Sequence, residues 1–483
     1  MNKRYLFIII CILIGIVKTE AQTLNEICKI DLPVVIINTE NNEEPTYESV
    51  SAPEGAMGES IINATKVPCS ITIRLHEDTL YESGIYKADT SGATIRIRGN
   101  TSAKMRAKPY KLKLEKKADL LMRNDYDKYK DKEFLLLITY NNCLKTYVGF
   151  TLNNIIDMPY KPAFRPVNVF MNNTYQGLYY LAESVKLNKN CRVNVDKKTG
   201  YIFEYDAYWW NEDYYIETEF INPAMKYTLK YPDTKNITED QKTYIEQWLK
   251  DMQLAVLDGQ SEDYLCLDTC ARWILAHDLL GISDGAGSNL FFAKSDNTSQ
   301  SKAYPVTLWD FDCVGKREDD WSSAHKGKYF FNAMFNNDKN NSFITVYCKE
   351  WINFNKSKVT EKLIADIKEF AASDEGKAFE KSFNLTNIRY KNYVPSWSIT
   401  AQAKTYEEWF TKRKEWIDES INNLYPEIMD SIHSQTRNIY FKDPFDKEDY
   451  SNNYNVYDIL GKKLPASYKG IQIKNRKKII VRE

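Results

Sequence analysis

The spacing of apolar residues changes near residue 236 of this chain. Before that point, segments such as ATIRIRGN (residues 93–100) and PYKLKLEKK (109–117) alternate apolar and polar residues, which is the period of a half-buried strand. After it, TEDQKTYIEQWLKDMQLAVL (238–257) and TYEEWFTKRKEWIDESINNLY (405–425) repeat their apolar residues with the period of an amphipathic helix. The chain therefore predicts an α+β fold, in which a β-rich part precedes a helical part.

The length and the charge of the chain limit its class. With 483 residues, of which 43% are hydrophobic, it is too long for one ordinary domain and can bury a sizeable core. Its 65 Lys and Arg residues balance 66 Asp and Glu residues, which gives a net charge of -1. Balanced charge provides no overall attraction to nucleic acid or to an anionic membrane. We therefore expect no nucleic-acid partner.

The N-terminal segment, residues 1–21, has the layout of a secretory signal. Two basic residues precede an apolar run from Tyr5 to Val17, and polar residues then lead to Ala21. The run has 13 residues, fewer than the roughly 20 that span a bilayer as a helix, which favours a cleaved signal over a membrane anchor. We expect cleavage after Ala21, no membrane span in the mature chain, and a location in the periplasm, at the cell surface or outside the cell.

Cysteines are even in number once the signal is set aside. An even number in an exported protein permits disulfides, and the sequence leaves their pairing open. The eight are Cys28, Cys69, Cys143, Cys191, Cys266, Cys270, Cys313 and Cys348.

Composition and periodicity divide the chain into four parts. The signal covers 1–21, and short strands separated by polar residues cover 22–90. A core of strands followed by helices covers 91–435, and a β-rich tail covers 436–483. Within the core, the segment RPVNVFMNNTYQGLYYLAESV predicts a hairpin that turns at Asn172 and Asn173.

Two segments carry acidic residues in a pattern that suits a metal ion. In YPVTLWDFDCVGK, strand alternation would place Asp310 and Asp312 on one face, where their charges repel each other. In SDGAGSN, Asp284 lies five residues before Asn289 in a glycine-rich loop. Carboxylate and amide oxygens are ligands that Mg²⁺ accepts. An ordinary turn of Asp, Gly and Asn, or a structural calcium site, is the alternative interpretation.

Two further segments suit phosphate. In RIRGNTSAK, Gly99 lies at the end of a predicted strand, and a glycine there lets backbone amides turn toward an anion. The next strand brings Lys108, Lys111 and Lys113, any of which can pair with phosphate oxygens. A plain hairpin turn and a solvated row of lysines are the structural alternatives.

The order of these segments is that of protein kinases, where an Asp orients the acceptor hydroxyl, an Asn five residues later holds one metal ion, and a later Asp holds Mg²⁺ on the nucleotide. At IRIRGNTS, KPYKLKL, NVFMNNTYQGLYYLAESV and SDGAGSNLFFAK…YPVTLWDFDCVG, over about residues 93–430, the sequence resembles the CotH kinase family of secreted and spore-coat atypical kinases. The resemblance implies a kinase-like fold of two lobes, a β-rich N-lobe and a helical C-lobe, with small flanking β segments. It also implies ATP with Mg²⁺ or Mn²⁺, and phosphate transfer to serine of exported proteins.

The resemblance assigns roles by position. Asp284 resembles the catalytic-loop Asp, and the metal ligands are Asn289, Asp310 and Asp312. Lys108 and Lys111 compete for the role of pairing with phosphate. The phosphate-covering turn comprises Gly99, Asn100, Thr101 and Ser102, and Glu183 ends a strand where kinases contact adenine. The chain lacks a full GxGxxG motif and has no His-Arg pair before Asp284, so the catalytic role of Asp284 rests on spacing.

The tail, residues 436–483, resembles C-terminal β-domains of exported Bacteroidota proteins, some of which act as sorting signals; a small β-module is the alternative. Three interpretations of function follow. The first is an exported ATP-dependent protein kinase acting on an exported protein substrate. The second is a nucleotide-dependent transferase with a non-protein acceptor. The third is a surface or structural protein that keeps the kinase fold without activity.

Overall fold

The computed structural model divides the chain into two compact units, Met1–Pro426 and Glu427–Glu483. The described residues are 23–54, 56, 58–123, 125–139, 143–221, 224–285, 289–327, 330–391, 397–440, 456–457, 463–464, 470–474 and 477–481. The predicted signal at 1–21 lies outside the described residues.

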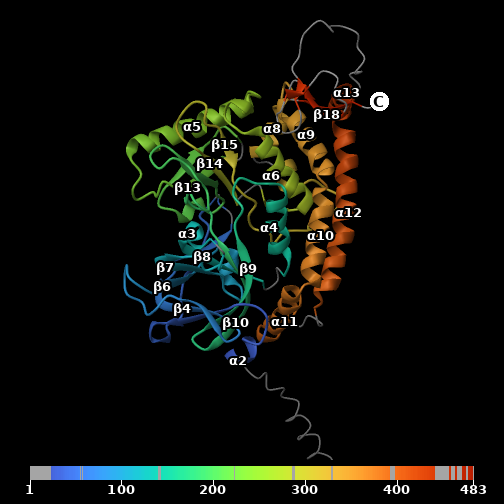
Figure 1. The fold of residues 1–483 in the computed structure, drawn as a ribbon. Coiled ribbons are helices and arrows are strands. Elements are labelled where there is room, and N and C mark those ends of the chain that lie inside the picture. Colours follow the sequence, from blue (N-terminus) through green and yellow to red (C-terminus); the bar gives the residue numbers. More distant parts are fainter. Residues whose placement is uncertain are drawn as a thin grey trace, which may run out of the picture. The chain divides into compact units, whose positions relative to one another are not determined.

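Eight strands of the first unit form one sheet, which closes on itself. They are β1 (Val34–Thr39), β4 (Val67–Leu75), β5 (Asp78–Glu82), β6 (Ala93–Ile97), β7 (Tyr110–Ala118), β8 (Asp131–Ile138), β9 (Phe164–Met171) and β10 (Thr174–Glu183). Their order is β1-β9-β10-β8-β7-β6-β4-β5, and β1 also pairs with β4, which closes a barrel (Figure 1). Because β1 and β4 belong to the predicted segment 22–90, the predicted boundary at residue 90 runs through one continuous sheet.

Alternation gives this closed sheet an apolar interior and a polar exterior. The interior side chains of β6 and β7 include Ile95, Ile97, Leu112 and Leu114. The residues between them face outward, and the strand register pairs Arg96 with Lys111 and Thr94 with Lys113. The exterior of β6 and β7 is therefore a polar, mainly basic surface.

The predicted hairpin at Asn172 and Asn173 is confirmed. β9 and β10 flank these two residues, which have φ angles of 49° and 60°. Two consecutive positive φ angles are typical of the tight turn that matches the twist of a hairpin, and Asn is among the residues that adopt them most readily.

Five strands of the first unit form a second, antiparallel sheet. They are β11 (Tyr201–Tyr205), β12 (Tyr215–Thr218), β13 (Met225–Tyr231), β14 (Leu290–Lys294) and β15 (Ala303–Pro305), in the order β12-β13-β11-β14-β15. β14 directly follows Asn289. A separate hairpin pairs β2 (Glu48–Ser51) with β3 (Glu59–Ile62).

Most helices of the first unit follow the periodicity predicted beyond residue 236. They are α2 (Leu24–Ile27), α3 (Tyr126–Tyr129), α4 (Lys145–Ile155), α5 (Glu239–Leu257), α6 (Leu267–Leu280), α7 (Ser323–Lys326), α8 (Phe330–Asn336), α9 (Ser342–Lys356), α10 (Val359–Ala372), α11 (Asp374–Arg389) and α12 (Ile399–Leu424). Figure 1 shows α10 and α12 side by side, and α11 beside β10. α5 starts with a capping box formed by Thr238 and Gln241. A short 3₁₀ turn, Ser261–Asp263, precedes α6.

The second unit contains α13 (Pro426–Tyr440) from its second residue onward. It also contains four short strands, β16 (Val456–Tyr457), β17 (Lys463–Leu464), β18 (Gly470–Lys474) and β19 (Lys477–Val481), in the order β17-β16-β18-β19. The tail thus contains the predicted short strands. Among the described residues, no helix is both long and apolar enough to cross a membrane, and all eight cysteines are free. The mixed α+β class is confirmed, and the kinase-like arrangement of two lobes stays a prediction.

Candidate active site

Two carboxylates and a thiol from separate segments meet beyond the end of α6. α6 is followed by Gly281, which has a left-handed backbone, and the chain then reaches Asp284. A carboxylate oxygen of Asp284, one of Asp312 and the sulfur of Cys313 all lie within 4.8 Å of one another. The thiol of Cys313 donates a hydrogen bond to Asp284 Oδ2 over 3.2 Å. The structure thus brings together two of the predicted site residues.

The surroundings of Asp284 favour its protonated form. Desolvation raises the pKa of Asp284, and the negative charge of Asp312 raises it further. The hydrogen bond from Cys313 and the positive charge of Lys145 act in the opposite direction. A carboxylate with a raised pKa is a stronger base, which suits a group that accepts a proton from a hydroxyl.

The strand that was predicted to carry Asp310 and Asp312 ends too early to do so. β15 stops at Pro305, and Asp310 has a left-handed backbone with a φ of 58°. The prediction that strand alternation places both carboxylates on one face is therefore wrong. The sequence pattern was misleading because an apolar run of this length is compatible with an extended segment that pairs with no neighbour.

Asp310 carries the clearest electrostatic signal in this region. Desolvation, followed by the charges of Asp312 and Asp284, raises the pKa of Asp310 to about 7, while Arg98 opposes this shift. Asp310 is nevertheless in contact with solvent, and the neighbouring carboxylates are the next causes of the shift after desolvation. The three acids form an excess of negative charge that a cation would relieve.

Asn289 also has a left-handed backbone, with a φ of 62°, and it is half-buried directly before β14. Residues 286–288, between it and Asp284, lie outside the described residues. Its predicted role as a metal ligand therefore stays a prediction.

Helix α4 packs directly against the segment Asp310–Asp312, which we call the acidic turn. Lys145, in its first turn, donates a hydrogen bond from Nζ to the backbone oxygen of Asp312 over 2.5 Å. One turn later, Gly149 meets the ring of Phe311 so closely that a Cβ atom on this glycine would lie 2.0 Å from the ring. Phe311 is buried and also packs edge-on against Phe150. α4 thus holds the residue that separates Asp310 from Asp312.

Sequence reasoning selected neither Lys145 nor Gly149. A glycine inside a helical pattern is a signal of close packing, so Gly149 was detectable. No local signal distinguishes Lys145 from the other lysines of the chain.

Arg98 supplies positive charge near the acids. It directly follows β6 and is half-buried. Burial lowers the pKa of its guanidinium, while the charges of Asp310 and Glu204 raise it. Glu204 lies on β11 and pairs with Lys230 over 2.9 Å. Arg98 therefore interacts with both the acidic turn and the second sheet, although it was not selected within the RIRG motif.

The predicted phosphate turn has the backbone that its glycine suggested. Gly99 has a φ of 85°, and a Cβ atom there would lie 2.4 Å from the hydroxyl oxygen of Ser102. The amide oxygen of Asn100 accepts a hydrogen bond from Ser60 over 2.5 Å, and the hydroxyl of Thr101 lies 3.4 Å from that of Tyr208. Because the side chains of Asn100 and Thr101 already have these partners, the turn would contact a phosphate mainly through its backbone amides.

The two competing lysines lie on different faces of the closed sheet. Lys108 donates a hydrogen bond to the carbonyl of Ala103 over 2.8 Å and lies over the ring of Tyr47. Its pocket, of about 300 Å³, also includes the interior residues Ile97 and Tyr110.

Lys111 faces outward and pairs with Glu133 over 2.9 Å. Desolvation lowers the pKa of Lys111, and Glu133 opposes this shift. Its strand partner is Arg96, and Arg98 lies two residues after Arg96, directly beyond the end of β6. Lys111, rather than Lys108, therefore shares its surface with the arginine that interacts with Asp310.

Glu183 is fully buried at the end of β10. Its carboxylate accepts hydrogen bonds from Arg123 over 2.9 Å, from the backbone amide of Ala163 over 3.0 Å and from the Tyr160 hydroxyl over 3.4 Å. Its side chain is thus committed to the protein interior, and the predicted contact with adenine stays a prediction.

Comparison with protein families identifies the chain. The family model described as CotH kinase protein matches residues 95–461. The chain belongs to the CotH kinase family. A comparison with curated proteins gives no match. The family match covers the acidic turn, α4 and most of the closed sheet, and membership in the CotH kinase family indicates a kinase-like phosphotransferase.

Proposed function

We propose that this protein is an exported kinase that uses ATP and Mg²⁺, or Mn²⁺, to phosphorylate hydroxyl groups of exported proteins, most simply serine. The observation that supports the proposal is the group of acids at Asp284, Asp310 and Asp312 with the positive charge of Arg98 near Asp310. Asp284 and Asp312 lie within reach of one ion, and the pKa of Asp310 rises to about 7 beside them. Such an arrangement suits a divalent cation bound to an anionic ligand.

The donor atoms fit the proposed metal. Carboxylate oxygens are the preferred ligands of Mg²⁺ and Mn²⁺, and Asp310, Asp312 and Asn289 would hold the ion. When bound, the metal would neutralise charge on the phosphates. Arg98 and Lys111 would bind phosphate oxygens, and backbone amides of the Gly99 turn would cover them.

Asp284 would orient the acceptor hydroxyl and accept its proton. This assignment rests on the exposure of Asp284 to solvent and on the raised pKa of its carboxyl. The hydrogen bond from Cys313 fixes the position of Oδ2. A positioned acid–base group of this kind contributes about 10²- to 10⁴-fold to the rate.

Mass spectrometry of the purified mature protein after incubation with ATP and Mg²⁺ tests the proposal. A mixture of exported proteins from the same cells serves as acceptor. We expect a phosphate adduct that disappears in Asp310→Ala. A different mass would indicate transfer of another group, as the second interpretation predicts. No adduct on any protein, from a preparation that melts cooperatively, would favour an inactive structural protein.

The Asp284→Asn variant separates chemistry from binding. We expect it to bind Mg-ATP about as well as the parent, because the proposed role of Asp284 is in the transition state, and to transfer phosphate about 10²-fold more slowly or worse. Calorimetry and a radiolabel assay measure the two quantities. Asp240→Asn, at an exposed position on α5, is the matched control. Equal transfer rates in the parent and in Asp284→Asn would show that Asp284 is not the catalytic residue and that the catalytic loop lies in another segment.

Export is part of the proposal and has its own test. N-terminal sequencing of the protein from its native host should find a mature chain that starts near Gln22, because the basic, apolar and small-residue order of residues 1–21 is that of a cleaved signal. Recovery of Met1 on most molecules would contradict export by this route.

A further inference from the structure

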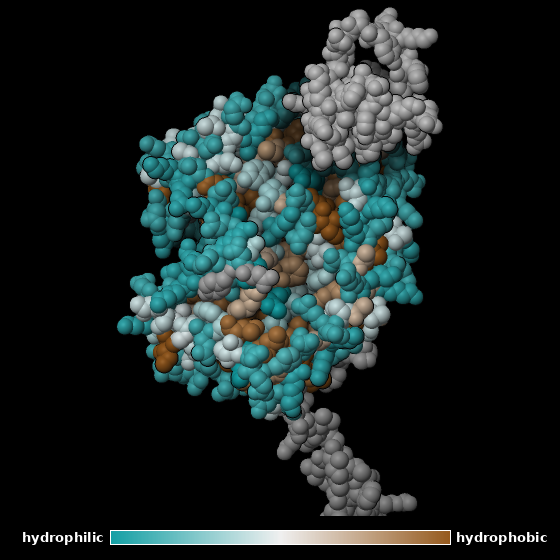
Figure 2. All heavy atoms as spheres, in the orientation of Figure 1, coloured by the Kyte–Doolittle hydropathy of each residue, from teal (hydrophilic) through white to brown (hydrophobic). Residues whose placement is uncertain are grey.

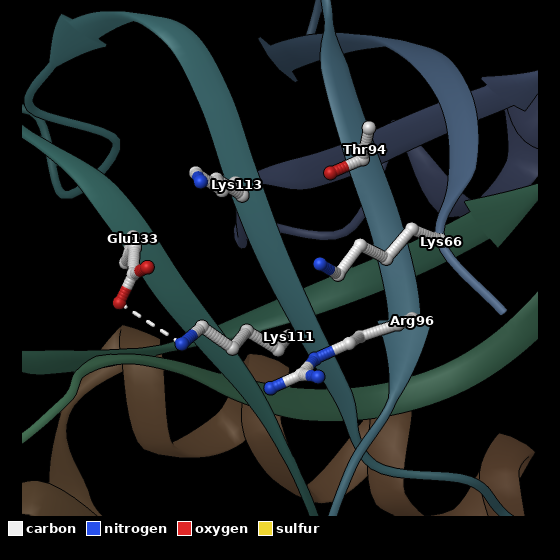
Figure 3. Close-up of a pocket in the computed structure, with 6 residues that line it drawn as sticks. All are labelled: Lys66, Thr94, Arg96, Lys111, Lys113 and Glu133. Carbon is white, nitrogen blue, oxygen red and sulfur yellow. Dashed lines mark ion pairs between the residues drawn. The ribbon is translucent and has the colours of Figure 1, made fainter. Parts of the chain in front are cut away.

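A small basic pocket lies on the outer face of the closed sheet. Its volume is about 100 Å³, and we call it the Arg96 pocket; its lining residues are Lys66, Thr94, Arg96, Lys111, Lys113 and Glu133. Figure 3 shows the side chain of Lys66 pointing across β6 toward β7, and that of Arg96 pointing from β6 toward Lys111. The strand registers of β6, β7 and β8 fix the spacing of most of these residues, so the pocket is built on a rigid frame.

The charges of the Arg96 pocket do not balance. It contains four cationic side chains and one carboxylate. Glu133 forms an ion pair with Lys111 over 2.9 Å and a longer one with Lys186 over 3.6 Å. Within the described part of the chain, no carboxylate forms an ion pair with Lys66, Arg96 or Lys113. After desolvation, the like charges of Arg96 and Lys186 also lower the pKa of Lys111. The pocket therefore has positive charge available for a ligand.

The size and chemistry of the pocket point to a compact anion. Pockets for nucleoside-sized or drug-sized ligands measure about 300–1,000 Å³, well above the volume here. None of the six lining residues offers the aromatic or aliphatic surface that would hold a base. A guanidinium beside ammonium groups matches the charge and the oxygen geometry of a phosphate.

We propose that the Arg96 pocket is a phosphate-binding subsite, which takes phosphate groups of a polyphosphorylated ligand. Arg96 lies on β6, and Arg98, two residues later, directly follows that strand, a separation of about 7 Å for an extended chain. A phosphate donor bound near Asp310 and Arg98 can thus place a further phosphate group in the Arg96 pocket. The inference rests on the proposed kinase function and implies that the donor is selected by its phosphates more than by its base. A phosphorylated side chain of the acceptor is the other source of the same group.

Titration calorimetry in the presence of Mg²⁺ tests the pocket with five probes: ATP, GTP, tripolyphosphate, adenosine and O-phosphoserine. We expect ATP, GTP and tripolyphosphate to bind within about threefold of one another and adenosine to bind at least about tenfold more weakly. Lys66→Ala and Lys113→Ala should each weaken tripolyphosphate binding by about tenfold, because each removes a charge-assisted hydrogen bond. Both lysines are exposed, so folding should be unaffected.

Lys116→Ala is the control, because Lys116 is an exposed lysine of the same strand β7 outside the pocket. Its tripolyphosphate affinity should match that of the parent. If the lysine variants lose O-phosphoserine binding and keep tripolyphosphate binding, the phosphate belongs to the acceptor. Tight binding of adenosine without binding of tripolyphosphate would overturn the subsite.

The outcomes also separate the subsite from the proposed function. If the parent transfers no group to any protein and its tripolyphosphate affinity still depends on Lys113, the subsite stands and the kinase proposal fails. If the parent transfers phosphate and neither Lys66→Ala nor Lys113→Ala changes its affinity for any probe, the kinase proposal stands and the subsite fails.

Discussion

Two of the predicted metal ligands, Asn289 and Asp310, share an uncommon left-handed backbone. Such a conformation is costly for residues other than glycine, although Asn and Asp tolerate it best, and it concentrates at functional sites. At Asp310 this cost is added to repulsion from Asp284 and Asp312. Both features destabilise the folded chain when no cation is bound. A bound cation would offset the repulsion between the carboxylates.

We therefore expect Asp310→Asn to be more stable than the parent when divalent ions are absent. The folded pKa of Asp310 is about 7, above the usual value of about 4 for an unfolded chain, so the folded protein holds this proton more tightly. Stability contributed by the protonated group is present below about pH 4 and is lost as the pH rises toward 7. The Asp310→Asn variant does not lose stability in this way, because the asparagine side chain does not titrate. Because the side chain is exposed and screened, the gain at pH 8 should be about 1 kcal/mol.

Thermal denaturation at pH 5 and pH 8 measures this effect. The parent should lose more stability than Asp310→Asn between the two values, and the variant should no longer bind Mg-ATP. The same pH dependence in both proteins would show that Asp310 is not under the strain that its neighbours imply.

At the scale of elements, α4 is the part that positions the acidic turn. It contributes Lys145 to the backbone oxygen of Asp312 and Gly149 to the ring of Phe311. The two residues are one helical turn apart and therefore lie on the same face of the helix. A small shift of α4 would move both neighbouring carboxylates together.

Gly149→Ala should damage the site although alanine is the better helix former. The substitution gains about 1 kcal/mol of helix propensity, but its Cβ atom would lie 2.0 Å from the ring of Phe311. Overpacking of this kind costs about 1–3 kcal/mol, so we expect lower stability and weaker binding of Mg-ATP, measured by melting curves and calorimetry.

The double variant Gly149→Ala with Phe311→Leu provides the control. A smaller side chain at 311 leaves room for the added methyl group, so part of the lost affinity should return, as a non-additive double-mutant cycle. If Gly149→Ala alone binds Mg-ATP like the parent, the close approach of α4 does not position the acids.

The elements also show how far sequence reasoning reaches. The turn of the β9–β10 hairpin and the start of α5 were predictable, because each depends on residues a few positions apart. The partners of the acids were not, because Lys145 meets a backbone oxygen 167 residues away. The supposed strand through Asp310 failed for the same reason: pairing with a neighbouring strand is a tertiary property that a local apolar run does not specify.

At the scale of the whole molecule, the closed sheet extends beyond the region that defines the family. The CotH match begins at residue 95, yet β1 pairs with both β4 and β9, and β4 pairs with β6. β6 leads directly to Arg98 and to the Gly99 turn. The strands that precede the family match therefore support the surface that carries the proposed phosphate contacts.

A chain that starts at residue 91 should consequently fail to fold, whereas one that starts at residue 22 should fold. Loss of β1 and β4 leaves β6 paired only with β7 and β9 paired only with β10, so each has one unpaired edge, and it opens the interior at Ile95 and Val169, which are fully buried in the closed sheet. An exposed apolar sheet edge promotes aggregation. Circular dichroism and calorimetry should show cooperative melting only for the longer chain.

As a milder test, Ile37→Asp in the longer chain places a charge in the apolar interior of the closed sheet and should lower its melting temperature sharply. Cooperative melting of the chain from residue 91 would instead make residue 90 a true domain boundary, and β1 and β4 would then be an addition to a CotH domain that is complete without them.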